Sequence, residues 1–110
     1  MIRSIQEVLD RISTIPQIAD KIVYDHFSTA QTLPFAAYTY TSYTDGADDF
    51  KGIQWINFNL ELYTEIRDFE LENTILTVFD DVEIQSDSTY LDSERMYITS
   101  FAFVFPHKIY

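Results

Sequence analysis

The clearest pattern in this chain is a regular alternation of apolar and polar residues along Gln54–Thr64. The apolar side chains on one side of this extended segment are those of Ile56, Phe58, Leu60 and Leu62. The positions between them, from Trp55 to Tyr63, fall on the other side and include asparagines and a glutamate. The pattern predicts a β-strand in a sheet that helices cover on one face only.

Further strands are predicted on both sides of this segment. Phe35–Tyr43 is rich in tyrosine and threonine, which favour extended structure. Glu83–Leu91 and Met96–Phe105 also read as strands, and the second alternates phenylalanines with smaller residues. We expect a turn between these two at Leu91-Asp92-Ser93-Glu94.

An amphipathic helix is predicted near the start of the chain, over about Ile2–Ser13. Its apolar residues recur at helical spacing, at Ile5, Val8, Leu9 and Ile12. Ser4 is a suitable N-cap, with Glu7 three residues on as its capping-box partner. Pro16 disfavours helical geometry at the residue before it and ends the element.

A second helix is predicted to begin after Asp68 and to end near Asp81. Asp68 is a suitable N-cap, and Glu70 and Glu72 lie in the first turn, where the helix dipole favours carboxylates. The residues of its apolar stripe are Leu71, Ile75, Val78 and Phe79.

One segment, Ile18–Phe27, fits either a helical turn or a short strand, and we predict a short strand over Lys21–Phe27. Together the elements predict a single domain over residues 1–110, a length that suits one hydrophobic core. The expected fold is α+β, with a sheet of four or five mostly antiparallel strands packed on one side by two helices.

Charge narrows the possible partners. The formal net charge is −11, and between Gly52 and Ser93 ten acidic residues stand against one basic residue, Arg67. Such a surface repels phosphate, so we expect neither tight nucleic-acid binding nor attachment to anionic membranes. The chain has no cysteine, which excludes disulfides and thiolate chemistry. No apolar run is long enough to predict a membrane span.

Catalytic and metal-binding patterns are weak throughout the chain. The histidines, His26 and His107, are far apart in sequence, and no serine lies in a nucleophile-elbow pattern. Asp45, Asp48 and Asp49 lack the spacing of a calcium loop and read as the tip of a solvated hairpin. We therefore expect no enzyme activity, no metal and no cofactor.

Several short motifs, in a fixed order over about two-thirds of the chain, resemble the tail-terminator family of long-tailed phages. This family belongs to the small tail-completion and head–tail joining proteins. The motifs are Pro34-Phe35 with Tyr38, Ala47-Asp48-Asp49-Phe50, Leu60-Glu61-Leu62-Tyr63-Thr64 with Asp68 and Glu72, and Ser93-Glu94-Arg95-Met96-Tyr97.

The resemblance implies a structural protein of the virion neck, assembled in the host cytoplasm. It implies a ring, usually a hexamer, that caps the tail tube and stops its polymerisation. Its partners would be further copies of itself, the tail-tube protein and the head connector or stopper protein. DNA would cross the lumen of the ring without specific binding, and no membrane would be involved.

The interface of such a ring is predicted on the loop Asp45–Lys51 and on the exposed side of Trp55–Tyr63. The candidate interface residues are Asp45, Asp48, Asp49, Phe50, Lys51, Trp55 and Tyr63. Two other hypotheses stay open at this point. The charge also suits an acidic inhibitor that mimics DNA and binds a nucleic-acid-binding protein, and the aspartate cluster suits a small metal-dependent hydrolase.

Overall fold

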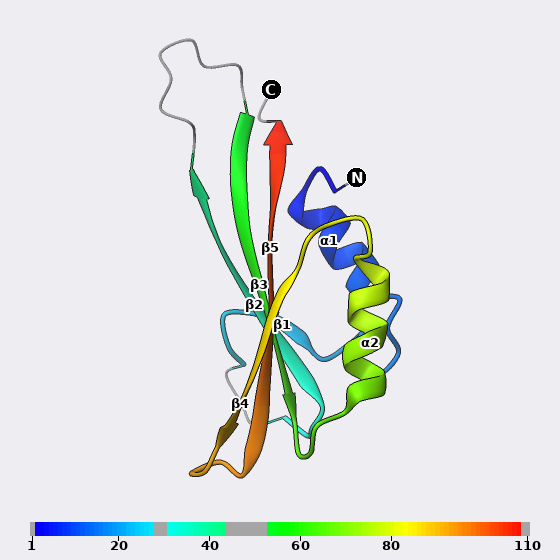
Figure 1. Cartoon of the computed structure of the whole chain (residues 1–110), viewed down its shortest axis with the longest axis vertical. Helices are drawn as coiled ribbons and strands as arrows, with labels where there is room; N and C mark the ends of the chain where they lie inside the picture. Colours follow the sequence, from blue (N-terminus) through cyan, green and yellow to red (C-terminus); the bar gives the residue numbers. More distant parts are fainter. Residues whose placement is uncertain (1, 28–30, 44–52, 109–110) are drawn as a thin grey trace.

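The computed structural model describes residues 2–27, 31–43 and 53–108, which form one five-stranded sheet and two helices (Figure 1). The elements are α1 (Ile5–Ile12), β1 (Ile22–Tyr24), β2 (Phe35–Tyr43), β3 (Ile53–Thr64), α2 (Phe69–Val78), β4 (Gln85–Leu91) and β5 (Met96–Lys108). The strand order is β1-β2-β3-β5-β4, and every pairing is antiparallel except that of β1 with β2. The α+β fold expected from the sequence is confirmed.

The domain is elongated along its strands. Its extents are 49 × 26 × 22 Å and its radius of gyration is 15.1 Å, against roughly 13 Å for a compact chain of this length. The strands β3 and β5 have 12 and 13 residues, whereas the helices have only 8 and 10. Because a strand rises more per residue than a helix, the sheet is much longer than the helices that pack on it.

Both helices lie on the same face of the sheet (Figure 1), which we call the covered face. The register places Phe58 of β3 directly between Tyr40 of β2 and Phe103 of β5, so their side chains share this face. Stacked and tilted rings cross the face from strand to helix, with centroids 5.1–5.5 Å apart, in the order Tyr38, Phe58, Phe103 and Phe79. The alternation read from the sequence therefore builds the core.

The predicted N-caps are confirmed at both helix starts. Ser4 accepts a hydrogen bond from the amide of Glu7 at 3.1 Å, whereas the Glu7 carboxylate accepts one from the amide of Arg3 and not, as a capping box would have it, from that of Ser4. Asp68 accepts a hydrogen bond from the amide of Leu71 at 3.0 Å. Each cap satisfies an amide that has no partner within its helix, which fixes where the helix begins.

The two helices are joined by Arg11 of α1. Its guanidinium donates to the backbone oxygen of Val78 at 3.2 Å and to both carboxylate oxygens of Asp81, at 2.7 and 3.0 Å. This hydrogen bonding holds the pKa of Asp81 well below its usual range. The pair therefore fixes α1 against the end of α2.

Glu72 lies in the first turn of α2, as expected, and has a further role that was not expected. Its side chain is buried and accepts two hydrogen bonds of 2.9 Å from Arg67. Thr99 of β5 lies 3.4 Å from the same carboxylate and 2.9 Å from the hydroxyl of Ser88 on β4. A buried carboxylate needs such partners, and this network ties the start of α2 to the sheet.

Element bounds differ from the expected ones mainly at helix ends. The first helix begins at Ile5, after its cap, and the second ends at Val78, three residues before Asp81. The fourth strand begins at Gln85, and the short first strand covers only Ile22–Tyr24. Turns at these ends keep the apolar pattern without the regular hydrogen bonds, so the pattern overestimates the length of these elements. It underestimates the last strand, which continues beyond the expected Phe105 to Lys108.

Candidate functional site

The face of the sheet opposite the helices, which we call the open face, is not covered by either helix of the described segments (Figure 1). At its centre the register aligns two rows of side chains across β2, β3 and β5. One row holds Thr41, Asn57 and Val104, and the other holds Thr39, Asn59 and Ala102. We call these six residues the neutral rows, because none of them carries a charge.

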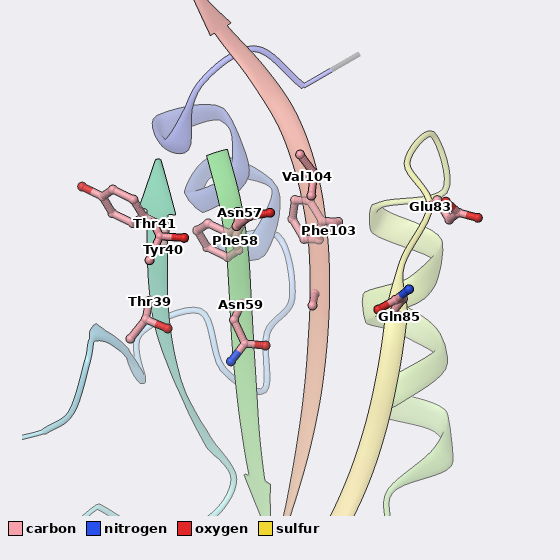
Figure 2. A pocket seen from close by; sticks show the side chains of 11 residues that line it. Thr39, Tyr40, Thr41, Asn57, Phe58, Asn59, Glu83, Gln85, Phe103 and Val104 are labelled. Atoms are coloured by element: carbon pink, nitrogen blue, oxygen red, sulfur yellow. The ribbon is translucent and has the colours of Figure 1, made fainter. Parts of the chain in front are cut away.

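A shallow hollow lies over the neutral rows, with a cavity volume of about 400 Å³. Figure 2 looks onto this hollow with the helices behind the sheet, and shows the side chains from β2, β3 and β5 around it. Gln85, the first residue of β4, and Glu83, two residues before it, line the side of the hollow. Small and neutral side chains make the surface accessible, and amides and hydroxyls supply donors and acceptors for a partner.

An apolar row lies at one end of the open face. There the register places Trp55 of β3 between Tyr43 of β2 and Pro106 of β5. Tyr43 is about half exposed, and Trp55 is partly buried. Aromatic side chains that are partly exposed beside small polar ones are typical of protein interfaces. The predicted interface residue Trp55 lies on the open face in the row next to that of Asn57.

At the other end of the open face, aromatic side chains pack against one another. Tyr63 stacks on Phe35 with ring centroids 4.7 Å apart, and Phe35 meets Phe27 edge to face. The hydroxyl of Tyr63 donates to Glu61 at 3.2 Å, and burial, followed by the Glu61 charge, raises the pKa of Tyr63 to about 12. Tyr63 is thus engaged within its own sheet, although it lies on the same face as Trp55.

Carboxylates border the neutral rows but do not lie within them, and Glu83 lines the side of the hollow. On β3 the nearest carboxylate is that of Glu61, one row below Asn59, in register with Ser100 and Asp87. Asp80, Asp81 and Glu83 are exposed around the end of α2. The neutral rows themselves therefore add no like charge to a contact with a second acidic molecule.

The structure brings some of the sequence-predicted interface residues to this face and leaves others undescribed. Trp55 and Tyr63 lie on the open face, at opposite ends of the neutral rows. The loop residues Asp45, Asp48, Asp49, Phe50 and Lys51 lie outside the described residues. Asn57 and Asn59 were predicted only as part of the exposed side of the strand, and their alternation was the signal that marked them.

The described part of the chain holds no cluster of three or more histidine, aspartate or glutamate side chains arranged to bind a metal ion. His26 lies beside Asp25, whereas His107 meets the backbone oxygen of Arg3, each at 3.0 Å. No helix among these residues is long and apolar enough to cross a membrane. Comparison of the chain with family models and with curated proteins finds no match.

Proposed function

We propose that this chain is a structural protein of a phage virion, a tail terminator or closely related head–tail joining component that acts by self-association. The observation that carries the proposal is the open face, whose centre is uncharged in a chain of net charge −11. Like-charged copies repel, so a neutral surface is where two copies can meet. The resemblance of the motifs around Pro34-Phe35 and Leu60–Thr64 to tail terminators supplies the context of a ring on a tail tube.

In this proposal the ring caps the tube, contacts the head connector and lets DNA pass through its lumen. The acidic surface supports the last point, because carboxylates do not hold phosphates. The protein works by shape and association, without catalysis, metal or cofactor. Within the ring, the open face meets a neighbouring copy, and Trp55 lies at the edge of the contact.

The test compares the same substitution on two surfaces. Asn57→Glu places a charge in the neutral rows, whereas Asn73→Glu places the same charge on the exposed side of α2. Each protein is examined by light scattering and by negative-stain microscopy, with and without purified tail tubes. We expect rings, or caps at one tube end, for the unaltered chain and for Asn73→Glu, and loss of both for Asn57→Glu.

A protein that stays monomeric at all concentrations and leaves tubes uncapped would contradict the proposal. The loop prediction is tested in the same assay. Substitution of Asp48 and Asp49 by asparagine is expected to disturb assembly on tubes more than folding. Normal capping by that variant would show that these two residues are not needed at the interface.

The second candidate is an acidic inhibitor of a nucleic-acid-binding protein, which the net charge of −11 favours. The exposed carboxylates around α2 would then imitate the phosphates of DNA. Tight binding to a nuclease or repressor at physiological salt, together with no effect on tail tubes, would support this candidate over the first.

A further inference from the structure

A second hollow lies where β3 turns into α2, and it shares no lining residue with the hollow of the open face. Its cavity volume is about 540 Å³. One wall is Leu33 and Pro34, just before β2, and the other is the connection from Thr64 to Phe69. We call this place the corner hollow. It therefore offers a separate surface from the one on which the proposed function rests.

Two large apolar side chains stand exposed at the corner hollow. Ile66 is 73% exposed and Phe69 is 66% exposed, although Phe69 is the first residue of a helix whose apolar stripe packs inward. Neither side chain belongs to the core. The guanidinium of Arg67 lies 4.6 Å from the centroid of the Phe69 ring, a cation–π contact that favours this position of the ring. Preorganised apolar side chains beside a hollow are the usual anchors of a protein contact.

Thr64, which lines the corner hollow, has a buried hydroxyl. The residue is only 5% exposed, and its Oγ1 has no hydrogen-bond partner among the described residues. Buried hydroxyls are normally paired, because an unpaired one loses its hydration without compensation. The local packing at this wall of the hollow is therefore not fully satisfied within the described residues.

The charge around the corner hollow indicates which charge a partner should carry. Glu65 and Glu70 are exposed on its rim. The only basic side chain there, Arg67, is already paired with Glu72 through two hydrogen bonds of 2.9 Å. The rim is therefore acidic, and it attracts a partner that carries positive charge next to an apolar group.

We propose that the corner hollow binds a segment of a partner protein in which an apolar side chain is flanked by lysine or arginine. The apolar side chain packs against Ile66 and Phe69, and the basic side chains meet Glu65 and Glu70. Because these residues lie outside the neutral rows, the corner can be occupied while the open face contacts another copy.

The test is a titration with two matched synthetic peptides, followed by backbone amide chemical shifts at physiological salt. In one peptide, leucine and phenylalanine are flanked by lysines, and in the other glutamate replaces every lysine. We expect the basic peptide to shift the amides of Thr64, Ile66 and Phe69. The acidic peptide is expected to leave them unchanged.

Variants separate docking from simple attraction between opposite charges. The double variant Ile66→Ser/Phe69→Ser keeps the net charge and removes the anchors, so we expect affinity for the basic peptide to fall about tenfold or more. Glu65→Gln/Glu70→Gln removes two charges at the rim and is expected to weaken binding clearly. Asp10→Asn/Asp20→Asn removes the same charge elsewhere and serves as its control.

Unfolding of each variant is measured in parallel, because all the substituted side chains are at least partly exposed and the fold should survive. Equal binding by Ile66→Ser/Phe69→Ser, shifts spread over the acidic surface, or no binding of the basic peptide would each overturn the proposal. These measurements do not depend on tube capping, so the proposal for the corner hollow and the proposed function can be contradicted separately.

Discussion

The two faces of the sheet differ in what their side chains do, although they alternate along the same strands. On the covered face, phenylalanines of β3 and β5 stack on one another and on Phe79 beyond α2. On the open face, the adjacent positions of the same strands carry asparagine, alanine and valine. One face thus supplies the free energy of folding, and the other presents a neutral surface that folding leaves free.

The centre of the open face carries only uncharged side chains, although the chain as a whole is strongly acidic. A sheet that only needed solubility would be expected to carry charges on its open face, and a chain of net charge −11 has many to place. The open face does carry Glu61 and Asp87, and Glu83 lines its hollow, but the neutral rows at its centre carry no charge. The proposed contact between copies through the open face would account for the uncharged centre of this face.

The largest expected difference in unfolding free energy is between substitutions of two neighbouring residues that lie on opposite faces of the sheet. Phe103→Ala removes a ring at the centre of the aromatic stack, and we expect it to lower the free energy of unfolding by about 3–5 kcal/mol. Val104→Ala changes a side chain that is 47% exposed, and a change within about 0.5 kcal/mol is expected. Denaturant unfolding of both variants measures the difference. Similar losses would show that both faces stabilise the monomer.

A smaller difference in unfolding free energy is expected between substitutions of two threonines on the covered face. Thr99 is bonded to Ser88 and Glu72, so Thr99→Val leaves polar partners unsatisfied and should cost about 1–2 kcal/mol. Thr64 has no such bond among the described residues, and Thr64→Val should raise the free energy of unfolding by up to about 1 kcal/mol. Thermal and denaturant unfolding test both signs. A loss of stability in Thr64→Val would mean that its hydroxyl is paired.

The smallest effect concerns pH and the link between the helices. The pKa of Asp81 is lower in the folded chain than in the unfolded one, because Arg11 stabilises the carboxylate. The pair therefore stabilises the fold above the unfolded pKa of about 4, and this contribution is lost as pH falls through the lowered folded pKa. For a partly exposed pair we expect less than about 1 kcal/mol.

Asp81→Asn gives the measurement. Its deficit in unfolding free energy, relative to the unaltered chain, should be constant near neutral pH and should shrink below about pH 4. Asp80→Asn, which removes a charge from the adjacent exposed residue, is the control. A deficit in Asp81→Asn that does not change with pH would argue against the pair.

Much of the fold could be predicted from local patterns in the sequence. The strand over Phe35–Tyr43 is confirmed at both ends, and the caps at Ser4 and Asp68 are confirmed by their hydrogen bonds. These features depend on residues a few positions apart. The parallel pairing of β1 with β2 could not be predicted, because a three-residue strand has no pattern that fixes its direction.

The sites were less predictable than the fold. Trp55 and Tyr63 were placed on one face by their spacing, but only the register shows that Tyr63 is held by Phe35. Ile66 and Phe69 were not predicted as an interaction surface. Their signal was available, since Phe69 follows the N-cap and lies off the apolar stripe, but a single exposed apolar residue is common. The hollow beside them depends on Leu33 and Pro34, which are distant in sequence.

The most direct test of the two-face account uses the absence of cysteine from this chain. Asn57→Cys and Asn73→Cys each introduce one thiol, on the open face and on the exposed side of α2. Their alkylation rates are compared in dilute protein, in concentrated protein and on tail tubes. The account predicts that assembly slows alkylation strongly at position 57 and hardly at all at position 73. Equal rates at position 57 in free and assembled protein would contradict it.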